Sequence, residues 1–277
     1  MRSTLAKTIA SGALVLSAVL AGPVHAGPIF LTGHDPDFHT NAGNGANLMR
    51  TGLSYATGGT YAGGLEKFLW VESRPITTPG GHLIGENSLV TLGLVLGTNY
   101  DRANGAELAG VNFANYSAIV IASSFGGLLS RAELDALITR KTDIENFINS
   151  GGGLFASAEC DDCGADLLGV APQLFGYLPV AVSSIGASGP FAVTAFGAGA
   201  PFNLTNADLN DPTHNSFGLT GGLNVVDFDN AGHATTLAGV VRVGGGGFQP
   251  VPEPASLLLV GAGLLGLVVA RRRRSSR

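Results

Sequence analysis

The sequence is poor in cysteine and in charged residues, and both shortages exclude classes of protein. It contains 2 cysteines in 277 residues, too few for a small domain built on disulfides. Charged residues make up 13% of the chain, which is not the composition of a highly charged, disordered chain. The formal net charge is −5, and the basic residues cluster only in the C-terminal tail, which disfavours nucleic acid as a partner.

Glycine and hydrophobic residues are plentiful instead. There are 42 glycines, and hydrophobic residues make up 45% of the chain. The glycines follow no Gly-X-Y period, which excludes a collagen-like chain. Part of the hydrophobic share belongs to two apolar segments close to the ends, so the middle of the chain has to be considered apart from them.

The N-terminal residues have the three-part layout of a secretory signal peptide. Arg2 and Lys7 supply the basic start, an apolar run covers residues 8–24, and small side chains precede the expected cleavage after Ala26. Signal peptidase is therefore an expected partner. The alternative is an uncleaved membrane anchor, but Pro23 interrupts the run, which is short for a span of about 20 residues.

Residues 251–277 combine three features in a fixed order. The triplet Pro252, Glu253, Pro254 comes first, an uncharged apolar stretch covers about residues 255–270, and four arginines follow at 271–274. As a helix rising about 1.5 Å per residue, the stretch would be roughly 24 Å long, slightly less than a bilayer's hydrocarbon core. The arginines should stay in the cytoplasm, so this transmembrane helix would leave the preceding chain outside.

This tail resembles the PEP-CTERM sorting signal of exosortase-bearing Gram-negative bacteria in all three features. The resemblance implies export through the inner membrane, transient anchoring there with the C-terminus in the cytoplasm, and processing by an exosortase near the Pro252, Glu253, Pro254 motif. The processed protein would then reach the cell surface or the extracellular space. An ordinary C-terminal membrane anchor is the alternative.

Setting both ends aside changes the charge of what remains. Residues 27–250 hold 8 basic and 19 acidic residues and so carry a net charge of −11. A body of this length can build one sizeable core, and its acidity is compatible with a bound cation such as a divalent metal. We expect one domain over residues 27–243 and a flexible glycine-rich linker over residues 244–250.

Short apolar runs alternate with helical patterns along this body, which predicts an α/β fold. Strands are expected at residues 28–32, 68–71, 116–123 and 154–158, and helices at 44–56, 87–96 and, as one long helix, 130–148. Ser130 and Glu133 form a capping box at the start of that long helix. Apolar stretches after residue 171 are expected to add strands that cover one end of the sheet.

The body is similar to class I glutamine amidotransferase-like domains, including the trehalose-utilisation (ThuA-like) branch. The similar features are the apolar run at 116–123, the strand that ends before Glu159, and residues 211–219, which partly match a late motif of these groups. The resemblance covers about residues 28–230. It implies a flavodoxin-like, mostly parallel sheet with helices on both faces.

The most concentrated polar group in the chain follows the first expected strand, where such sheets bind their ligands. His34 and Asp37 belong to this group, and Glu159 and His214 are expected to join it in space. These four are the candidate catalytic residues, because imidazole and carboxylate can act as general acid and base. The alternative is structural, with Asp37 capping the loop that follows.

A divalent metal is the one cofactor that these residue types suggest. His34, Asp35 and His39 combine imidazole and carboxylate ligands, which suit a transition metal. The alternative is that Asp35 forms a turn with the proline that follows it.

The two cysteines are expected to form a local disulfide. Cys160 and Cys163 stand close together in a chain that is expected to reach an oxidising compartment. A catalytic amidotransferase cysteine lies on a glycine-flanked turn, whereas Cys160 has Glu159 and Asp161 as neighbours, which raise the pKa of a thiol. Glutaminase activity is therefore not expected.

Together these features favour an exported cell-surface or extracellular-matrix protein with a non-catalytic, amidotransferase-like binding domain. Extracellular polysaccharide is a candidate partner. The rival hypothesis is a ThuA-like hydrolase or carbohydrate-active enzyme that uses the His, Asp and Glu residues of the cleft, with or without a metal. The two hypotheses share one candidate site and differ in whether it carries out chemistry.

Overall fold

The computed structural model describes most of the body between the two terminal segments. The described residues are 26–40, 45–73, 85–124, 129–158, 174–178, 181–210 and 215–241. The expected signal peptide apart from Ala26, the glycine-rich linker and the C-terminal transmembrane helix lie outside them. Residues 26–250 form one compact unit. None of the helices described within it combines the length and apolarity needed to cross a membrane.

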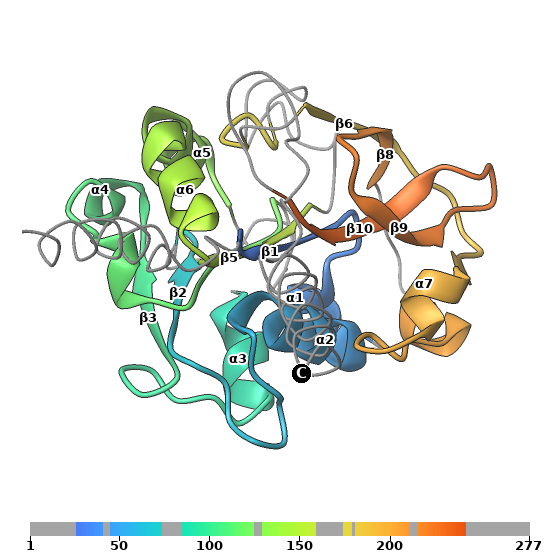
Figure 1. Cartoon of the computed structure of the whole chain (residues 1–277), viewed down its shortest axis with the longest axis horizontal. Helices are drawn as coiled ribbons and strands as arrows, with labels where there is room; N and C mark the ends of the chain where they lie inside the picture. Colours follow the sequence, from blue (N-terminus) through green and yellow to red (C-terminus); the bar gives the residue numbers. More distant parts are fainter. Residues whose placement is uncertain are drawn as a thin grey trace, which may run out of the picture. The chain divides into compact units, whose positions relative to one another are not determined.

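Five of the described strands form the parallel half of one sheet (Figure 1). They are β1 (Pro28–Thr32), β2 (Phe68–Val71), β3 (Tyr100–Ala103), β4 (Ala118–Ile121) and β5 (Gly153–Ser157). Every residue of β2, β4 and β5 is buried, as expected for strands covered on both faces. The four strands expected from apolar runs are thus confirmed, whereas β3 has no such run because Asp101 and Arg102 lie at the sheet edge.

The order of the parallel strands is β3-β2-β4-β5-β1. In a flavodoxin-like sheet the N-terminal strand lies between the second and third strands. Here β1 instead pairs with β5 on one side and with β10 on the other, so it lies in the interior of a ten-stranded sheet. The α/β class is confirmed, but the strand order differs from the flavodoxin-like order that the resemblance implies.

The other half of the sheet is antiparallel and continues from β1. Its strands are β6 (Val182–Gly186), β7 (Ala192–Val193), β8 (Asn215–Thr220), β9 (Asn224–Phe228) and β10 (Ala234–Val240). β10 pairs with β1 and also with β8 and β9, while β6 adds to β8 and β7 adds to β9. The apolar stretches after residue 171 were expected to cover one end of the sheet. They instead extend the sheet past β1.

Helices cover both faces of the parallel half (Figure 1). One face carries α2 (Gly45–Thr57) and α3 (Glu86–Thr91), and the other carries α4 (Gly105–Leu108), α5 (Arg131–Thr139) and α6 (Lys141–Asn149). Side chains alternate along a strand, so Phe30 packs into the core on the α2 and α3 side, while Ile29 and Leu31 pack into the core on the α5 and α6 side. The short helices are α1 (Pro36–His39), η2 (Phe113–Asn115), α7 (Ala195–Ala198) and η4 (Asn206–Leu209).

The helix in the segment after β2 is shorter than expected. The helix expected over residues 87–96 ends at Thr91. Gly93 has a φ of +82°, a left-handed conformation that follows many helix ends. Beyond it, Leu94 is half-buried against the core, whereas Val95 and Leu96 are exposed.

The long helix expected over residues 130–148 is instead two helices, α5 and α6, that meet at Arg140. The expected start is confirmed, since the Glu133 carboxylate accepts the Ser130 N–H at 3.0 Å. At the break, Arg140 Nη1 donates to the carbonyl oxygens of Leu108 and Val111, both at 2.7 Å. These bonds tie the break to the turn after α4, which no local pattern predicts.

Candidate functional site

Five buried acidic or imidazole side chains lie at the carboxyl edge of the sheet. We call them the carboxyl-edge cluster: His34, Asp35, Asp37, Glu72 and Asp227. None is more than 1% exposed. The first three follow β1, Glu72 follows β2, and Asp227 belongs to β9. Parallel strands end at one edge, and this edge is where open α/β sheets bind their ligands.

A carboxylate from the antiparallel half of the sheet holds His34. The His34 Nε2 lies 3.0 Å from Oδ2 of Asp227. The backbone N–H of His34 donates to Oγ1 of Thr32 at 3.1 Å, and that hydroxyl lies 3.0 Å from Oγ1 of Thr236 on β10. Asp227 is opposite Thr236 in the β9–β10 pairing, so the sheet itself brings the carboxylate to the ring. A bond to one ring nitrogen orients the imidazole and leaves the other nitrogen for a second partner.

The chain enters the cluster through a glycine and a proline. A Cβ at Gly33 would lie 2.1 Å from the carbonyl oxygen of Asn215, so glycine is the residue that fits there. Pro36 is the first residue of α1, and its fixed φ suits the start of a helix. The short helix then directs Asp37 inward, while His39 at its end is partly exposed.

Asp37 connects the end of β1 to the end of β4. Its Oδ2 accepts the backbone N–H of Ser123 at 2.8 Å. Burial raises the pKa of Asp37 to about 6, and the nearby Asp35 carboxylate adds to the rise, while the Ser123 N–H opposes it. Asp37 can therefore gain or lose a proton close to neutral pH.

Glu72 lies directly after β2 and is the second acid with a strongly altered pKa. Burial raises the pKa of Glu72 to about 8, and the carboxylates of Glu86 and Asp37 contribute to the rise. Its Oε2 accepts the N–H of Glu86 at the start of α3, 3.1 Å away. At neutral pH Glu72 is thus mainly a neutral acid, able both to donate and to accept a hydrogen bond.

Asp35 pairs with a histidine of its own short helix. Its Oδ2 lies 3.3 Å from Nε2 of His39, and the carboxylate is 1% exposed. Asp35 directly follows His34, whose own partner is Asp227. The ion-pair partners of the two aspartates are thus both histidines, so the cluster is strongly acidic when these rings are neutral.

Each member of the cluster also has a buried polar atom without a hydrogen-bond partner among the residues that the structure describes. These atoms are His34 Nδ1, both carboxylate oxygens of Asp35, Asp37 Oδ1, Glu72 Oε1 and Asp227 Oδ1. A buried polar atom left without a partner costs about 1–3 kcal/mol, so a concentration of them calls for a further partner such as water or a ligand.

The structure brings two of the four expected catalytic residues, His34 and Asp37, to the same edge of the sheet. Glu159 and His214 lie outside the described residues, as do Cys160 and Cys163, so these predictions stay predictions. Glu72 and Asp227 were missing from the expected set. Glu72 has a sequence signal, because an acid directly after a buried parallel strand falls at the carboxyl edge, but Asp227 has none.

The metal set expected from the sequence, His34, Asp35 and His39, does not form a common centre. Within the described part of the chain, no three His, Cys, Asp or Glu side chains are arranged to hold a metal ion. His34 and Asp35 are instead engaged in separate pairs with Asp227 and His39. A metal at this edge would need ligands beyond the described residues.

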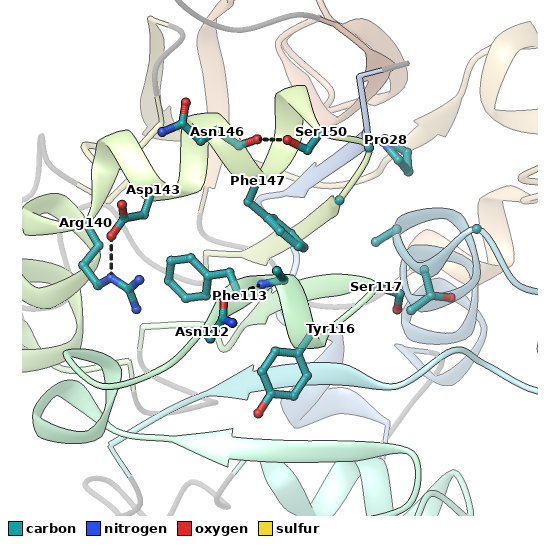
Figure 2. Close-up of a pocket in the computed structure, with 16 residues that line it drawn as sticks. Pro28, Asn112, Phe113, Tyr116, Ser117, Arg140, Asp143, Asn146, Phe147 and Ser150 are labelled. Carbon is teal, nitrogen blue, oxygen red and sulfur yellow. Dashed lines mark hydrogen bonds and ion pairs between the residues drawn. The ribbon is translucent and has the colours of Figure 1, made fainter. Parts of the chain in front are cut away.

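A cavity of about 590 Å³ lies at the opposite, amino edge of the strands (Figure 2). Its lining includes Pro28 at the start of β1, Ser117 before β4 and Gly152 before β5. Arg140 also lines it, but the guanidinium is engaged by Asp143 at 2.9 Å and by backbone carbonyls. The cavity therefore offers fewer uncommitted charged groups than the carboxyl-edge cluster.

The comparison with known protein families concerns the C-terminal tail. Residues 250–274 match the family model described as the PEP-CTERM protein-sorting motif. The match includes Pro252, Glu253 and Pro254 and agrees with the resemblance noted in the sequence. It marks the chain as an exported protein that is held transiently at the membrane and processed by an exosortase.

The body of the chain gains no such assignment. The family match begins at residue 250, so it does not support the amidotransferase-like or ThuA-like resemblance of the domain. No curated protein matches the chain. What the domain does must therefore be inferred from its own geometry.

Proposed function

We propose that this exported, exosortase-processed protein is a binding module that holds a neutral, hydroxyl-rich ligand at the carboxyl-edge cluster without converting it. The observation that carries the proposal is the set of six buried polar atoms at that edge that have no hydrogen-bond partner among the described residues. Sugar hydroxyls suit such a site because each donates and accepts. An extracellular polysaccharide is the ligand class that agrees with export.

The charges of the cluster favour an uncharged ligand over an anion. Two of its carboxylates, Asp35 and Asp227, pair with histidines, and residues 27–250 carry a net charge of −11. An anionic ligand would be repelled by Asp35 and Asp227. Glu72, with its pKa raised to about 8 by burial, can donate to a hydroxyl at neutral pH.

The experiment measures binding of glucose oligomers and galacturonate oligomers to the exported chain by calorimetry at pH 6. We expect the neutral oligomers to bind and the acidic ones to bind at least tenfold more weakly. Asp37→Ala should weaken neutral binding at least tenfold, because it removes a carboxyl group of the cluster. The matched control is Asp143→Ala, which removes an exposed carboxylate at the amino edge.

Two results would contradict this function. One is the absence of heat and of any thermal shift with the neutral oligomers. The other is equal binding by wild type and Asp37→Ala, which would place the ligand elsewhere.

A hydrolase is the second candidate, and a specific observation favours it. Asp37 and Glu72 interact electrostatically, and their pKa values are raised to about 6 and about 8. Two carboxyl groups with separate pKa values near neutrality can act as base and acid. Product analysis after incubation with the same oligomers decides: hydrolysis that Asp37→Asn reduces at least a hundredfold would support an enzyme, and intact oligomers would exclude it for these substrates.

A further inference from the structure

The start of the domain is bonded to the end of α6. The backbone N–H of Gly27 donates to the carbonyl oxygen of Ile148 at 2.7 Å. Ile148 lies in the last turn of the helix, where carbonyl groups lack partners within the helix itself. The N–H of Gly151 donates to the same oxygen at 3.0 Å. The nitrogen of residue 27 is thus part of the C-terminal cap of α6.

This close approach requires glycine at position 27. A Cβ there would lie 1.8 Å from the carbonyl oxygen of Gly152 and 2.9 Å from the carbonyl carbon of Gly151. Both contacts are with backbone, which cannot rotate away as the end of a long side chain does. Gly27, the residue expected to become the first of the exported chain, is therefore the residue type that fits at this position.

The C-terminal end of α6 has no positive charge of its own. Its last turn contains no basic residue. The charged side chains that line the neighbouring cavity, Arg140 and Asp143, lie at the N-terminal end of α6 and pair with each other at 2.9 Å (Figure 2). The partial negative charge of the helix end is therefore available to a cation.

We infer that signal-peptide removal supplies this cation: cleavage after Ala26 converts the Gly27 nitrogen into an α-ammonium group that caps α6. Signal peptidase hydrolyses the Ala26–Gly27 peptide bond with one water, which leaves a carboxylate on Ala26 and an amine on Gly27 that takes up a proton. The same nitrogen keeps its bond to Ile148 and gains a positive charge. The processed domain is thereby more stable than one with a neutral N-terminus. The inference rests on the export part of the proposed function and is independent of ligand binding.

The charge makes the effect depend on pH in a defined direction. An α-amino group ordinarily has a pKa of about 7.7–8.0, and the helix end favours its charged form in the folded state. Its folded-state pKa is then raised above the unfolded value. The stabilisation is fully present below the unfolded pKa and is lost as the pH rises through the folded one. The pair of Arg140 and Asp143 is present whether the Gly27 nitrogen is free or acetylated, so it does not contribute to a difference between these two forms.

The experiment has two parts. N-terminal sequencing of the exported protein should find Gly27 as the first residue. The chain from residue 27 to 277, in mild detergent, is then compared with the same chain acetylated on the Gly27 nitrogen. We expect acetylation to lower the melting temperature by about 1–4 °C at pH 6.5, with the difference disappearing at pH 10 and shrinking at high salt.

Each outcome decides the inference. A different first residue would overturn it at the cleavage step. Equal melting temperatures at pH 6.5, or a difference that persists unchanged at pH 10, would overturn it at the charge step. Ligand binding by both forms would show that the proposed function stands whether or not this inference does.

Discussion

Burial controls the chemistry of the individual residues in the carboxyl-edge cluster. Burial raises the pKa of Glu72 to about 8 and that of Asp37 to about 6. Neither acid has a cationic side chain as a hydrogen-bond partner, since their bonded oxygens accept backbone N–H groups of Glu86 and Ser123. Both residues are therefore poised between a neutral and a charged form near the pH of most extracellular environments.

The Glu72→Gln variant tests this state of the buried acid. An acid whose folded pKa exceeds its unfolded value stabilises the protein less and less as the pH rises between the two values. For Glu72 that window extends from about 4.5 to about 8. Urea unfolding at pH 5, 7 and 9 should find the variant close to wild type at pH 5 and more stable by on the order of 4 kcal/mol at pH 9. A stability difference between the variant and wild type that is constant with pH would contradict the raised pKa of Glu72.

Breaking the buried pair of His34 and Asp227 should be costly. Removing one partner leaves the other buried with an unmet bond, which costs about 3–5 kcal/mol in comparable cases. We expect Asp227→Ala to lower the free energy of unfolding by that amount at pH 7. The control is Asp135→Ala, whose partner Arg131 is exposed, and which should cost about 1 kcal/mol or less. Similar losses in both variants would show that the buried pair has no special weight.

The sequence predicts only part of this cluster. His34 and Asp37 follow a strand that its apolar run reveals, so their place at the carboxyl edge can be expected. Asp227 is 193 residues from His34 and reaches it only through the β1–β10 and β10–β9 pairings. No local pattern encodes that contact, because it depends on how two distant strands pair.

At the scale of helices and strands, burial on both faces made the difference between elements that can and cannot be predicted. β2, β4 and β5 are continuous apolar runs, and each is found where the sequence places it. β3 and β8 are not, since β3 lies at an edge with charged residues and β8 has exposed residues at Gly218 and Leu219. The break between α5 and α6 likewise depends on contacts that Arg140 makes with another part of the chain.

The packing of α2 against β5 depends on a glycine at the start of the strand. A Cβ at Gly153 would lie 1.8 Å from the carbonyl oxygen of Ala56, near the end of α2. We expect Gly153→Ala to lower the free energy of unfolding by about 1–3 kcal/mol. Gly110→Ala is the matched control, because its Cβ would meet its nearest neighbour at 3.8 Å and the change should be neutral or mildly stabilising. Equal effects on urea unfolding would contradict the role of this contact.

At the scale of the whole molecule, the two edges of the sheet have different properties. The carboxyl edge concentrates buried acids and histidines, whereas the amino edge carries the cavity and the bond between Gly27 and α6. We infer that ligand binding and N-terminal processing act on opposite edges, so a change at one should leave the other intact. The sorting motif at residues 250–274 is the part of the function that the sequence indicates most directly.

Replacing Glu253 by alanine tests that outer part separately. Glu253 is the one acidic residue of the tail and the centre of the Pro252, Glu253, Pro254 motif, which an exosortase would have to recognise. In a host that bears an exosortase, we expect wild type to be released with a shortened C-terminus. The Glu253→Ala chain should stay in the membrane fraction at its full mass. Ser276→Ala, beyond the arginines, serves as the control and should be processed like wild type. Normal release of the Glu253→Ala chain, measured by fractionation and mass spectrometry, would refute processing through this motif. Because residues 26–250 form a separate unit, ligand binding by the retained protein should be unchanged.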